Sequence, residues 1–577
     1  MTSILKCLRL ERILPIPLSI AIFLTLLYMV NFFKPFFYPT INRVTFPRRM
    51  TIYIVNSYVD FLILLLSIMA TVAILLALLN NRRRVILLML TLILIYFLTS
   101  SSYLPLYLSL IPAMFFTLMP RGLRIAVARG SLAVFMVLII IIEVLSLTGW
   151  LLLPLSPKPY DLLENPYPWI EAKLFYLASL LQPVIASMLV LTPIIYLVVK
   201  YFIPPPTYRG LNSKYSHYLL PISTTLSIFL AYYPYIPSIN PSGKPVGVDI
   251  EWIYVPIFEE LMGLEFREAL VKASTVLLGR PFFFIPLYIL LLATRLPPIL
   301  VTKFLPLALA PCYVLSVYLS VKVLTKDRFT ASISSFIAAT SHFFTVGMFS
   351  GQLANWLAFI FIQPSIALLI EAVRLGSYRK ALYSTVLSIV AMYTHAHLWA
   401  VYFASIAIYT VMRRRGVKIL TLWLSINIVM DLVKTYVLNT SGGVRGDVEI
   451  ASSSCTLDNL YSFWIINNNL FRYFYAGYLT MPLLYILAIV GLISVKESYG
   501  ELFRILVAIS TPIYFASPEG LQARVLLSLP LDILASIGLT LILGRCRRGE
   551  GIITAALILL IFINYSLRAL AGMVVIS

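Results

Sequence analysis

The chain has 577 residues, of which 60% are hydrophobic and only 12% are charged. A soluble globular protein does not have such a composition, so the sequence predicts a protein made mostly of membrane-spanning segments. The net charge of +21 would suggest nucleic-acid binding in a soluble protein. Here the Lys and Arg residues cluster in short loops between apolar runs, which is typical of membrane topology, and we expect no nucleic-acid partner.

Apolar runs of roughly 18 or more residues, each able to cross a hydrocarbon layer about 30 Å thick, recur along the whole chain. They are long and continuous, unlike the alternating segments of an outer-membrane barrel. The sequence therefore predicts an all-α polytopic protein of the cell (plasma) membrane, with about 16 to 17 transmembrane helices in the lipid bilayer.

Residues 1–206 are expected to form an N-terminal block of about six transmembrane helices. Lys6, Arg9 and Arg12 precede a long apolar run without a small-residue cleavage site, which indicates an anchor with a cytoplasmic N-terminus. The predicted spans lie near Ile13–Phe33, Ile52–Leu79, Val85–Thr99, Tyr103–Leu118, Ser131–Leu153 and Phe175–Phe202.

Three successive prolines, Pro204 to Pro206, predict an extended linker, because proline cannot continue a helix. Residues 207–577 are therefore expected to form a second module. A span near Leu219–Tyr233 carries the chain outward, so the polar, turn-rich loop that ends at Trp252 lies on the external face.

The apolar run Phe282–Thr294 is too short for an ordinary crossing and is expected to be re-entrant or external. If it crossed the membrane, three consecutive basic loops would become external, against the usual charge bias. The later spans then alternate, near Phe304–Leu324, Ala331–Phe349, Asn355–Val373, Ala381–Tyr393, Leu398–Met412, Ile419–Tyr436, Tyr478–Val495, Leu502–Phe515, Val525–Leu543 and Ile552–Val574.

Asp249 and Glu251 are the first candidates for chemistry, since they are carboxylates in an otherwise apolar chain. They are separated by one residue in a segment whose Pro and Gly residues favour an extended or turn conformation. In an extended segment both side chains point the same way, as a shared metal ion or a general base requires. The alternative is that both carboxylates are simply solvated.

Other candidates come from distant parts of the chain but share the predicted external side. His395 ends one span, and its alternative role is a hydrogen-bonded packing residue. Arg524 lies where the chain re-enters the membrane, and its guanidinium suits a phosphate, unless it pairs structurally with a group such as Asp532. Candidate substrate-binding residues are Asn240, Asn355, Arg280 and Arg295, although interfacial arginines commonly snorkel.

From about Leu211 to the end, the chain resembles integral-membrane glycosyltransferases of the GT-C superfamily. The resemblance depends on Asn240-Pro-Ser-Gly-Lys-Pro-Val-Gly-Val-Asp249, Lys303-Phe-Leu-Pro, Gly351-Gln-Leu-Ala-Asn355, Thr394-His395 and Arg524-Val-Leu-Leu-Ser-Leu-Pro530. It implies a GT-C-like module whose external loop carries an essential Asp, here Asp249, acting as a base or a metal ligand. The N-terminal block departs from the usual order, in which this loop follows the first helix of the protein.

The resemblance also bears on metal dependence. Its diphosphate-donor branch uses a divalent metal such as Mg²⁺ or Mn²⁺ with several acidic ligands, whereas monophosphate-donor enzymes can work without one. Asp249 and Glu251 are the candidate ligands in this chain, and a second acidic pair is found at Asp447 and Glu449.

The sequence thus predicts a glycosyltransferase that moves a sugar from a polyprenyl-phosphate carrier to a lipid, glycan or protein acceptor on the external face. Asp249 is expected to deprotonate or orient the acceptor, while Arg524 and His395 bind the donor phosphate. The alternatives are a multi-pass transporter or lipid flippase, which should show an internal repeat, and a non-catalytic scaffold.

Overall fold

The computed structural model describes residues 40–45, 51–56, 139–155, 182–202, 216–275, 279–413, 416–440, 481–516, 525–544 and 548–576. Among them one hairpin is not helical: strand β1 (Thr40–Thr45) pairs antiparallel with β2 (Thr51–Asn56). The all-α prediction holds for the other described segments. The expectation that a membrane span begins at Ile52 is wrong, because β-branched and aromatic residues from Ile52 to Val55 favour a strand.

Three helices in the described segments are long and apolar enough to cross a membrane, namely Pro298–Thr325, Leu353–Leu375 and Gly551–Val574. Shorter apolar helices accompany them at Ile139–Leu155, Pro281–Thr294, Ala396–Met412, Pro482–Ser494 and Leu531–Leu543. These helices are what the structure offers in support of a membrane protein. The predicted number of crossings stays a prediction.

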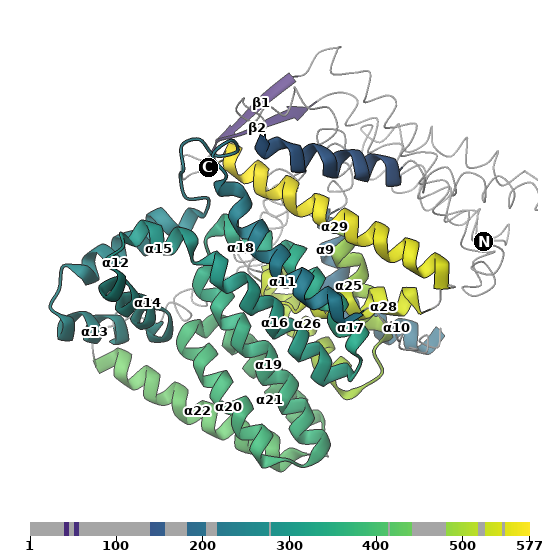
Figure 1. The fold of residues 1–577 in the computed structure, drawn as a ribbon. Helices are drawn as coiled ribbons and strands as arrows, with labels where there is room; N and C mark the ends of the chain where they lie inside the picture. The colour runs from purple at the N-terminus through teal and green to yellow at the C-terminus, as the bar shows by residue number, and fades with distance from the viewer. Residues whose placement is uncertain are drawn as a thin grey trace, which may run out of the picture.

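After helix Ile139–Leu155 the helices follow in chain order (Figure 1). They are α9 (Gln182–Val190), α10 (Thr192–Phe202), α11 (Ser216–Tyr232), the short turns η3 (Tyr233–Tyr235) and η4 (Ile250–Tyr254), α12 (Val255–Met262), α13 (Phe266–Thr275), α14 (Pro281–Thr294), α15 (Pro298–Phe304), α16 (Pro306–Thr325), α17 (Arg328–Thr340), α18 (His342–Ser350), α19 (Leu353–Leu375), α20 (Tyr378–Thr394), α21 (Ala396–Met412), α22 (Val417–Thr440), α25 (Pro482–Ser494), α26 (Ser498–Ala516), α28 (Leu531–Leu543) and α29 (Arg548–Ile576).

Most helices after α15 lie where apolar runs predict spans, with one clear difference. The predicted span Ala331–Phe349 is two helices, α17 and α18, which are separated at Ser341. Ser341 has the extended backbone of a helix N-cap, with φ −89° and ψ 170°. Averaged hydropathy does not reveal such a break, because the segments on both sides of Thr340-Ser341-His342 are mostly apolar.

The core is a bundle in which α19 packs against α16 and α20, while α17 packs against α11, α16 and α28. The group α12 to α15 lies at the side of this bundle, next to α20 and α22 in the view of Figure 1. Phe282 of α14 contacts Tyr393 near the end of α20, with ring centroids 5.5 Å apart. The short helix predicted at Phe282–Thr294 therefore packs beside one end of the bundle.

Helices from the predicted N-terminal block share this core. The Tyr233 hydroxyl donates to the Trp150 carbonyl oxygen at 2.9 Å, and the Ser238 hydroxyl donates to the Pro154 carbonyl oxygen at 2.8 Å. Asn564 of α29 donates to the Glu143 carboxylate, which is only 2% exposed. Helix Ile139–Leu155 thus contacts both the start of the predicted catalytic loop and α29 (Figure 1). The domain division into 1–206 and 207–577 stays a prediction, since its linker lies outside the described residues.

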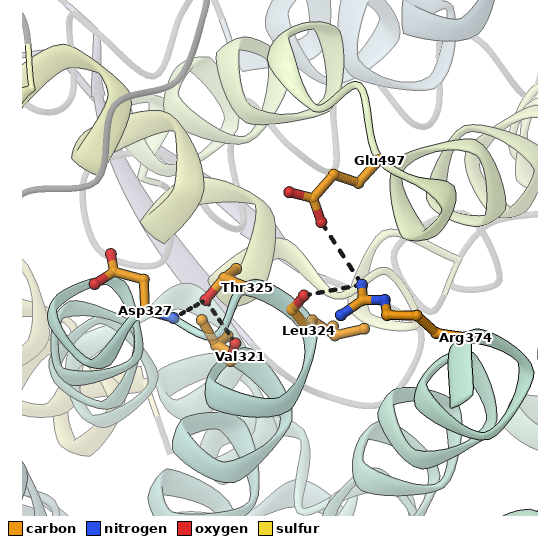
Figure 2. Close-up of polar contacts among 6 residues, drawn as sticks. All are labelled: Val321, Leu324, Thr325, Asp327, Arg374 and Glu497. Atoms are coloured by element: carbon orange, nitrogen blue, oxygen red, sulfur yellow. Dashed lines mark hydrogen bonds and ion pairs between the residues drawn. The ribbon is translucent and has the colours of Figure 1, made fainter. Parts of the chain in front are cut away.

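Several basic loops meet at one end of the bundle. Figure 2 shows Arg374, in the last turn of α19, donating to the Leu324 carbonyl oxygen of α16 at 3.4 Å and pairing with Glu497 at 3.7 Å. Close by in sequence, Asp327 caps α17 by accepting from the Phe329 and Thr330 N–H groups. The end of α16, the end of α19 and the turn before α26 are therefore joined at the basic end.

Two glycines let α25 and α28 approach closely. A Cβ atom at Gly491 would lie 2.0 Å from the Leu534 carbonyl oxygen, and one at Gly538 would lie 2.0 Å from the Leu487 carbonyl oxygen. Such backbone contact is typical of small residues at helix interfaces in membrane proteins.

We expect Gly538→Ala to destabilise the protein by about 1–3 kcal/mol or more, because the added methyl group meets rigid backbone. Gly347→Ala is the control, since its Cβ would find its nearest neighbour, a Trp356 ring carbon, at an ordinary 3.8 Å. Thermal unfolding of the detergent-purified protein measures both effects. Equal unfolding midpoints for the two variants would contradict the close contact of α25 and α28.

Candidate functional site

A polar pocket lies at the end of the bundle opposite the basic loops. The residues that line it come from five separate segments of the chain: Asp249, Tyr254, Arg280, Gln352, Asn355, His395, His397 and Ser528. The space between its atoms, part of which is open to solvent, is about 370 Å³. Four of the predicted site residues, Asp249, Arg280, Asn355 and His395, are thereby brought together.

The pocket and the basic end are separated by the length of a membrane-spanning helix. Gln352 precedes α19 and Arg374 lies in its last turn, and a helix of 23 residues is about 34 Å long. The shorter helix α20 runs the opposite way, with Arg379 and Lys380 in its first turn and His395 directly after its end. The pocket therefore lies at the start of α19 and the end of α20, opposite the ends of these helices that carry Arg374, Arg379 and Lys380.

Three helices begin at the pocket. Arg280 is the N-cap residue of α14, Gln352 that of α19 and His395 that of α21. A helix N-terminus presents unpaired N–H groups and carries an effective positive charge of roughly half a unit. Together with the Arg280 guanidinium, these N-termini make the pocket suitable for an anion.

His395 has a defined hydrogen bond that sets its role. Its Nδ1 accepts from the Leu398 N–H at 3.3 Å, so the side chain caps α21. In the neutral imidazole this acceptor role leaves the proton on Nε2. The ring of His397 lies 6.5 Å away, centroid to centroid, at an angle of 74°. His395 is thus able to offer an N–H donor to a ligand while its other nitrogen holds the helix.

The loop before Asp249 is fixed by side chains from outside it. The Lys303 ammonium donates to the Gly243 carbonyl oxygen at 2.6 Å and lies 4.8 Å from the centre of the Tyr235 ring. The Tyr235 hydroxyl accepts from the Val246 N–H at 3.3 Å. Burial raises the pKa of Tyr235 to about 12, so its hydroxyl stays neutral at physiological pH.

Gly351 brings Asp249 against the start of α19. It has a positive φ of 69°, and a Cβ atom there would lie 2.9 Å from the Asp249 nitrogen and 3.2 Å from its Cβ. Tyr254 adds a second tie, because its hydroxyl accepts from the Ala354 N–H at 3.4 Å. The absence of a side chain at Gly351 thus places the Asp249 carboxylate beside Asn355.

Of the two conformations expected for Asp249 and Glu251, extended or turn, the extended one is wrong. Asp249 has helical backbone angles, φ −72° and ψ −12°, and Glu251 lies in the π-helical turn η4. Residues two apart on a helix point to different sides. Asp249 accordingly lines the pocket, whereas Glu251 is exposed and does not.

The structure places three other predicted residues elsewhere or leaves them undescribed. Asn240 is buried and serves its own turn, donating to the Lys244 carbonyl oxygen at 2.9 Å and accepting from Ser242. Arg295 is exposed in a left-handed conformation at the far end of α14 from Arg280. Arg524 lies outside the described residues, and Ser528, which follows on the same segment, lines the pocket.

Four lining residues were not among the predicted site residues. Gln352 lies inside the Gly351–Asn355 motif, and His397 follows His395 by two positions. Their proximity in sequence to predicted site residues could have indicated both. No sequence pattern indicated Tyr254 or Ser528 as site residues, because a single Tyr or Ser in an apolar segment is ordinarily a packing residue.

The possible divalent-metal site with Asp249 and Glu251 as ligands stays a prediction. No three His, Cys, Asp or Glu side chains among the described residues form a group that could hold a metal ion, and Glu251 is exposed whereas Asp249 lines the pocket. The second acidic pair, Asp447 and Glu449, lies outside the described residues. We therefore derive no step through a metal ion.

No model of a known protein family matches this chain, and no curated protein sequence is detectably similar to it. The inference of function consequently depends on the geometry and charge of the pocket.

We expect Gly351→Ala to destabilise the protein more than Gly376→Ala does. Both glycines have nearly the same positive φ, 69° and 68°, so both variants incur the conformational cost of about 1–2 kcal/mol. Only Gly351 is packed against Asp249, while nothing lies within 4 Å of a Cβ at Gly376. The difference between their thermal unfolding midpoints measures the contact, and equal midpoints would contradict it.

Proposed function

We propose that this protein is an integral-membrane glycosyltransferase that transfers a sugar from a polyprenyl phosphate to an acceptor. The observation that supports this most is that one carboxylate, Asp249, shares a pocket with Arg280 and with three helix N-termini. Sugar transfer from a lipid phosphate needs these two things together, a base for the acceptor and an anion site for the leaving group.

The proposed reaction uses Asp249 as the base. As the acceptor oxygen forms a bond to the anomeric carbon of the sugar, the acceptor proton passes to the Asp249 carboxylate. The bond between the anomeric carbon and the phosphate oxygen breaks, and its electron pair leaves with the polyprenyl phosphate. The negative charge that develops on the phosphate is stabilised by Arg280, the His395 Nε2–H and the helix N-termini, with Arg524 as a further candidate.

The proposed setting is a multi-pass protein of the plasma membrane, with about 16 to 17 crossings and the pocket on the external face. The basic loops at the other end support this orientation, because Lys and Arg are enriched in cytoplasmic loops. Exposed apolar side chains on the helices support a lipid environment, for example Leu319 (51% exposed), Val386 (51%) and Val429 (56%).

The sharpest test compares Asp249→Asn with Glu251→Gln in membranes supplied with radiolabelled polyprenyl-phosphate sugars. Asp249→Asn removes the proposed base, and we expect transfer to fall by about 10²–10⁴-fold. Glu251→Gln is the matched control, two residues away and exposed, and should keep wild-type transfer. Undiminished transfer by Asp249→Asn would disprove the role of Asp249. Binding and translocation of the lipid without transfer by the wild type would favour a flippase instead.

His395 can be tested so that its two roles separate. Asn is a good helix N-cap, so His395→Asn should keep the stability of the protein while removing the Nε2–H donor. We expect transfer to fall about 10–100-fold, as for loss of a hydrogen bond to a charged group. His395→Ala should lose the same activity and also about 1 kcal/mol of stability through the lost cap. Normal transfer by His395→Asn would restrict this residue to a structural role.

A further inference from the structure

Lys434 is a cation buried in the helical bundle, and the proposed reaction gives it no direct role. It lies on α22 and is only 4% exposed, whereas residues on other faces of the same helix are exposed, for example Leu432 (62%) and Tyr436 (70%). Helix α22 packs along α20 (Figure 1). Because burying a charge in an apolar environment is costly, an ionisable residue at such a position indicates a functional role.

The Lys434 ammonium bonds to the end of α20. Its Nζ donates to the Met392 carbonyl oxygen at 3.0 Å, and Met392 lies in the last turn of α20, three residues before His395. The Nζ also lies 5.5 Å from the centre of the Tyr393 ring, within the range of a cation–π interaction. The last carbonyl groups of a helix have no N–H partner within that helix, and Lys434 supplies a donor to one of them.

The same side chain contacts the turn that carries Arg280. Gly279, directly before Arg280, has a positive φ of 60°, and a Cβ atom there would lie 3.2 Å from Lys434 Cε and 3.6 Å from its Nζ. Lys434 therefore packs directly against the Gly279 backbone. It thus contacts the chain immediately before two residues of the polar pocket, Arg280 and His395.

The end of α20 works against the binding of an anion in the pocket. His395 is both the C-cap residue of α20 and the N-cap residue of α21. The N-terminus of α21 favours an anion, but the C-terminus of α20 carries the opposite partial charge, roughly half a negative unit. A cation bonded to the last turn of α20 offsets this negative end. Lys434 is such a cation, and it does not itself line the pocket.

We propose that Lys434 is a positioning residue for the anion-binding part of the polar pocket, an inference that rests on the proposed function. Its ammonium acts through Arg280 and His395, because it fixes the backbone before each of them and offsets the negative end of α20. The ligand that depends on it most is the monoester phosphate left on the polyprenyl carrier after transfer. A monoester phosphate carries up to two negative charges, whereas the donor diester carries one, so it responds more strongly to the local potential.

The test measures phosphate binding by the full chain purified in detergent. The protein is titrated with radiolabelled undecaprenyl phosphate and, in parallel, with the uncharged alcohol undecaprenol. Lys434→Met removes the ammonium and keeps an unbranched chain of similar length. We expect it to weaken phosphate binding about 5–30-fold, as for a favourable charge–dipole interaction in a partly buried site, and to leave binding of the alcohol unchanged. Equal phosphate affinity in wild type and Lys434→Met would overturn the proposal.

Binding also separates this role from the proposed transfer. Asp249→Asn, which removes the proposed base, should bind undecaprenyl phosphate at least as tightly as the wild type, because it removes a negative charge from the pocket. The role of Asp249 can therefore fail while the role of Lys434 holds, and the reverse. A wild type that binds the phosphate no more tightly than the alcohol would overturn the anion site and the role of Lys434 together.

Two further variants distinguish positioning from general support of the fold. Lys434→Arg keeps a cation that can donate to Met392 and should restore most of the phosphate affinity. Asn427→Leu, about two turns earlier on α22, removes the acceptor of the Ser388 and Trp399 side chains. It should lower the unfolding midpoint and keep the phosphate affinity. A loss of affinity in Asn427→Leu equal to that in Lys434→Met would overturn the proposal.

If Lys434→Met does not fold, Gly279→Ala decides the matter, with Gly376→Ala as its control. The two glycines have similar positive φ angles, 60° and 68°, so the two variants bear a similar backbone cost. A methyl group at Gly279 would press on Lys434, whereas nothing lies within 4 Å of one at Gly376. Gly279→Ala alone should therefore weaken phosphate binding, and equal affinities in the two variants would overturn the proposal.

Discussion

The backbone contact between Gly351 and Asp249 is the constraint on which the polar pocket depends. It joins the first loop of the predicted second module to the start of α19, two segments about 100 residues apart in the chain. Any side chain at Gly351 would occupy the space of the Asp249 backbone. Because α19 begins directly after this contact, the carboxylate is set beside Asn355 and the first turn of the helix.

The same end of the bundle has an electrostatic character that single residues do not provide. Arg280, Gln352 and His395 each start a helix, so the positive ends of α14, α19 and α21 meet in one place. Asp249 is a negative group among them. A pocket with one carboxylate and several positive dipoles can hold an anion and also deprotonate a neighbouring group, which is the combination that the proposed transfer requires.

A further buried polar group lies in the first turn of α28, close in sequence to the pocket residue Ser528. Helix α28 follows the segment that contributes Ser528, and its first turn carries the buried Asp532, whose carboxyl accepts from the Tyr313 hydroxyl of α16. On another side, helix Ile139–Leu155 holds the beginning of the predicted catalytic loop through Tyr233 and Ser238. The N-terminal region therefore contributes directly to the support of the loop, and the polar pocket does not depend on the second module alone.

Part of the site could be predicted from the sequence because charge and hydropathy are local properties. The distribution of Lys and Arg among the loops placed Asp249, Asn355 and His395 at the same end of the helices, and the pocket does contain all three. The short run at Phe282–Thr294 was likewise visible, and α14 covers it. These signals require only the composition of each segment and the alternation of its direction.

Other features were decided by tertiary structure alone. Asp249 packs against Gly351, about 100 residues away in the chain, and the local Pro and Gly residues could not decide between an extended segment and a helical turn. Ser528 and Tyr254 are ordinary residues in their own segments. The sequence determined which segments are apolar and which end of each helix is basic, since both follow from the residues themselves. Which polar side chains meet was decided only when distant helices packed, because that depends on contacts between residues far apart in the chain.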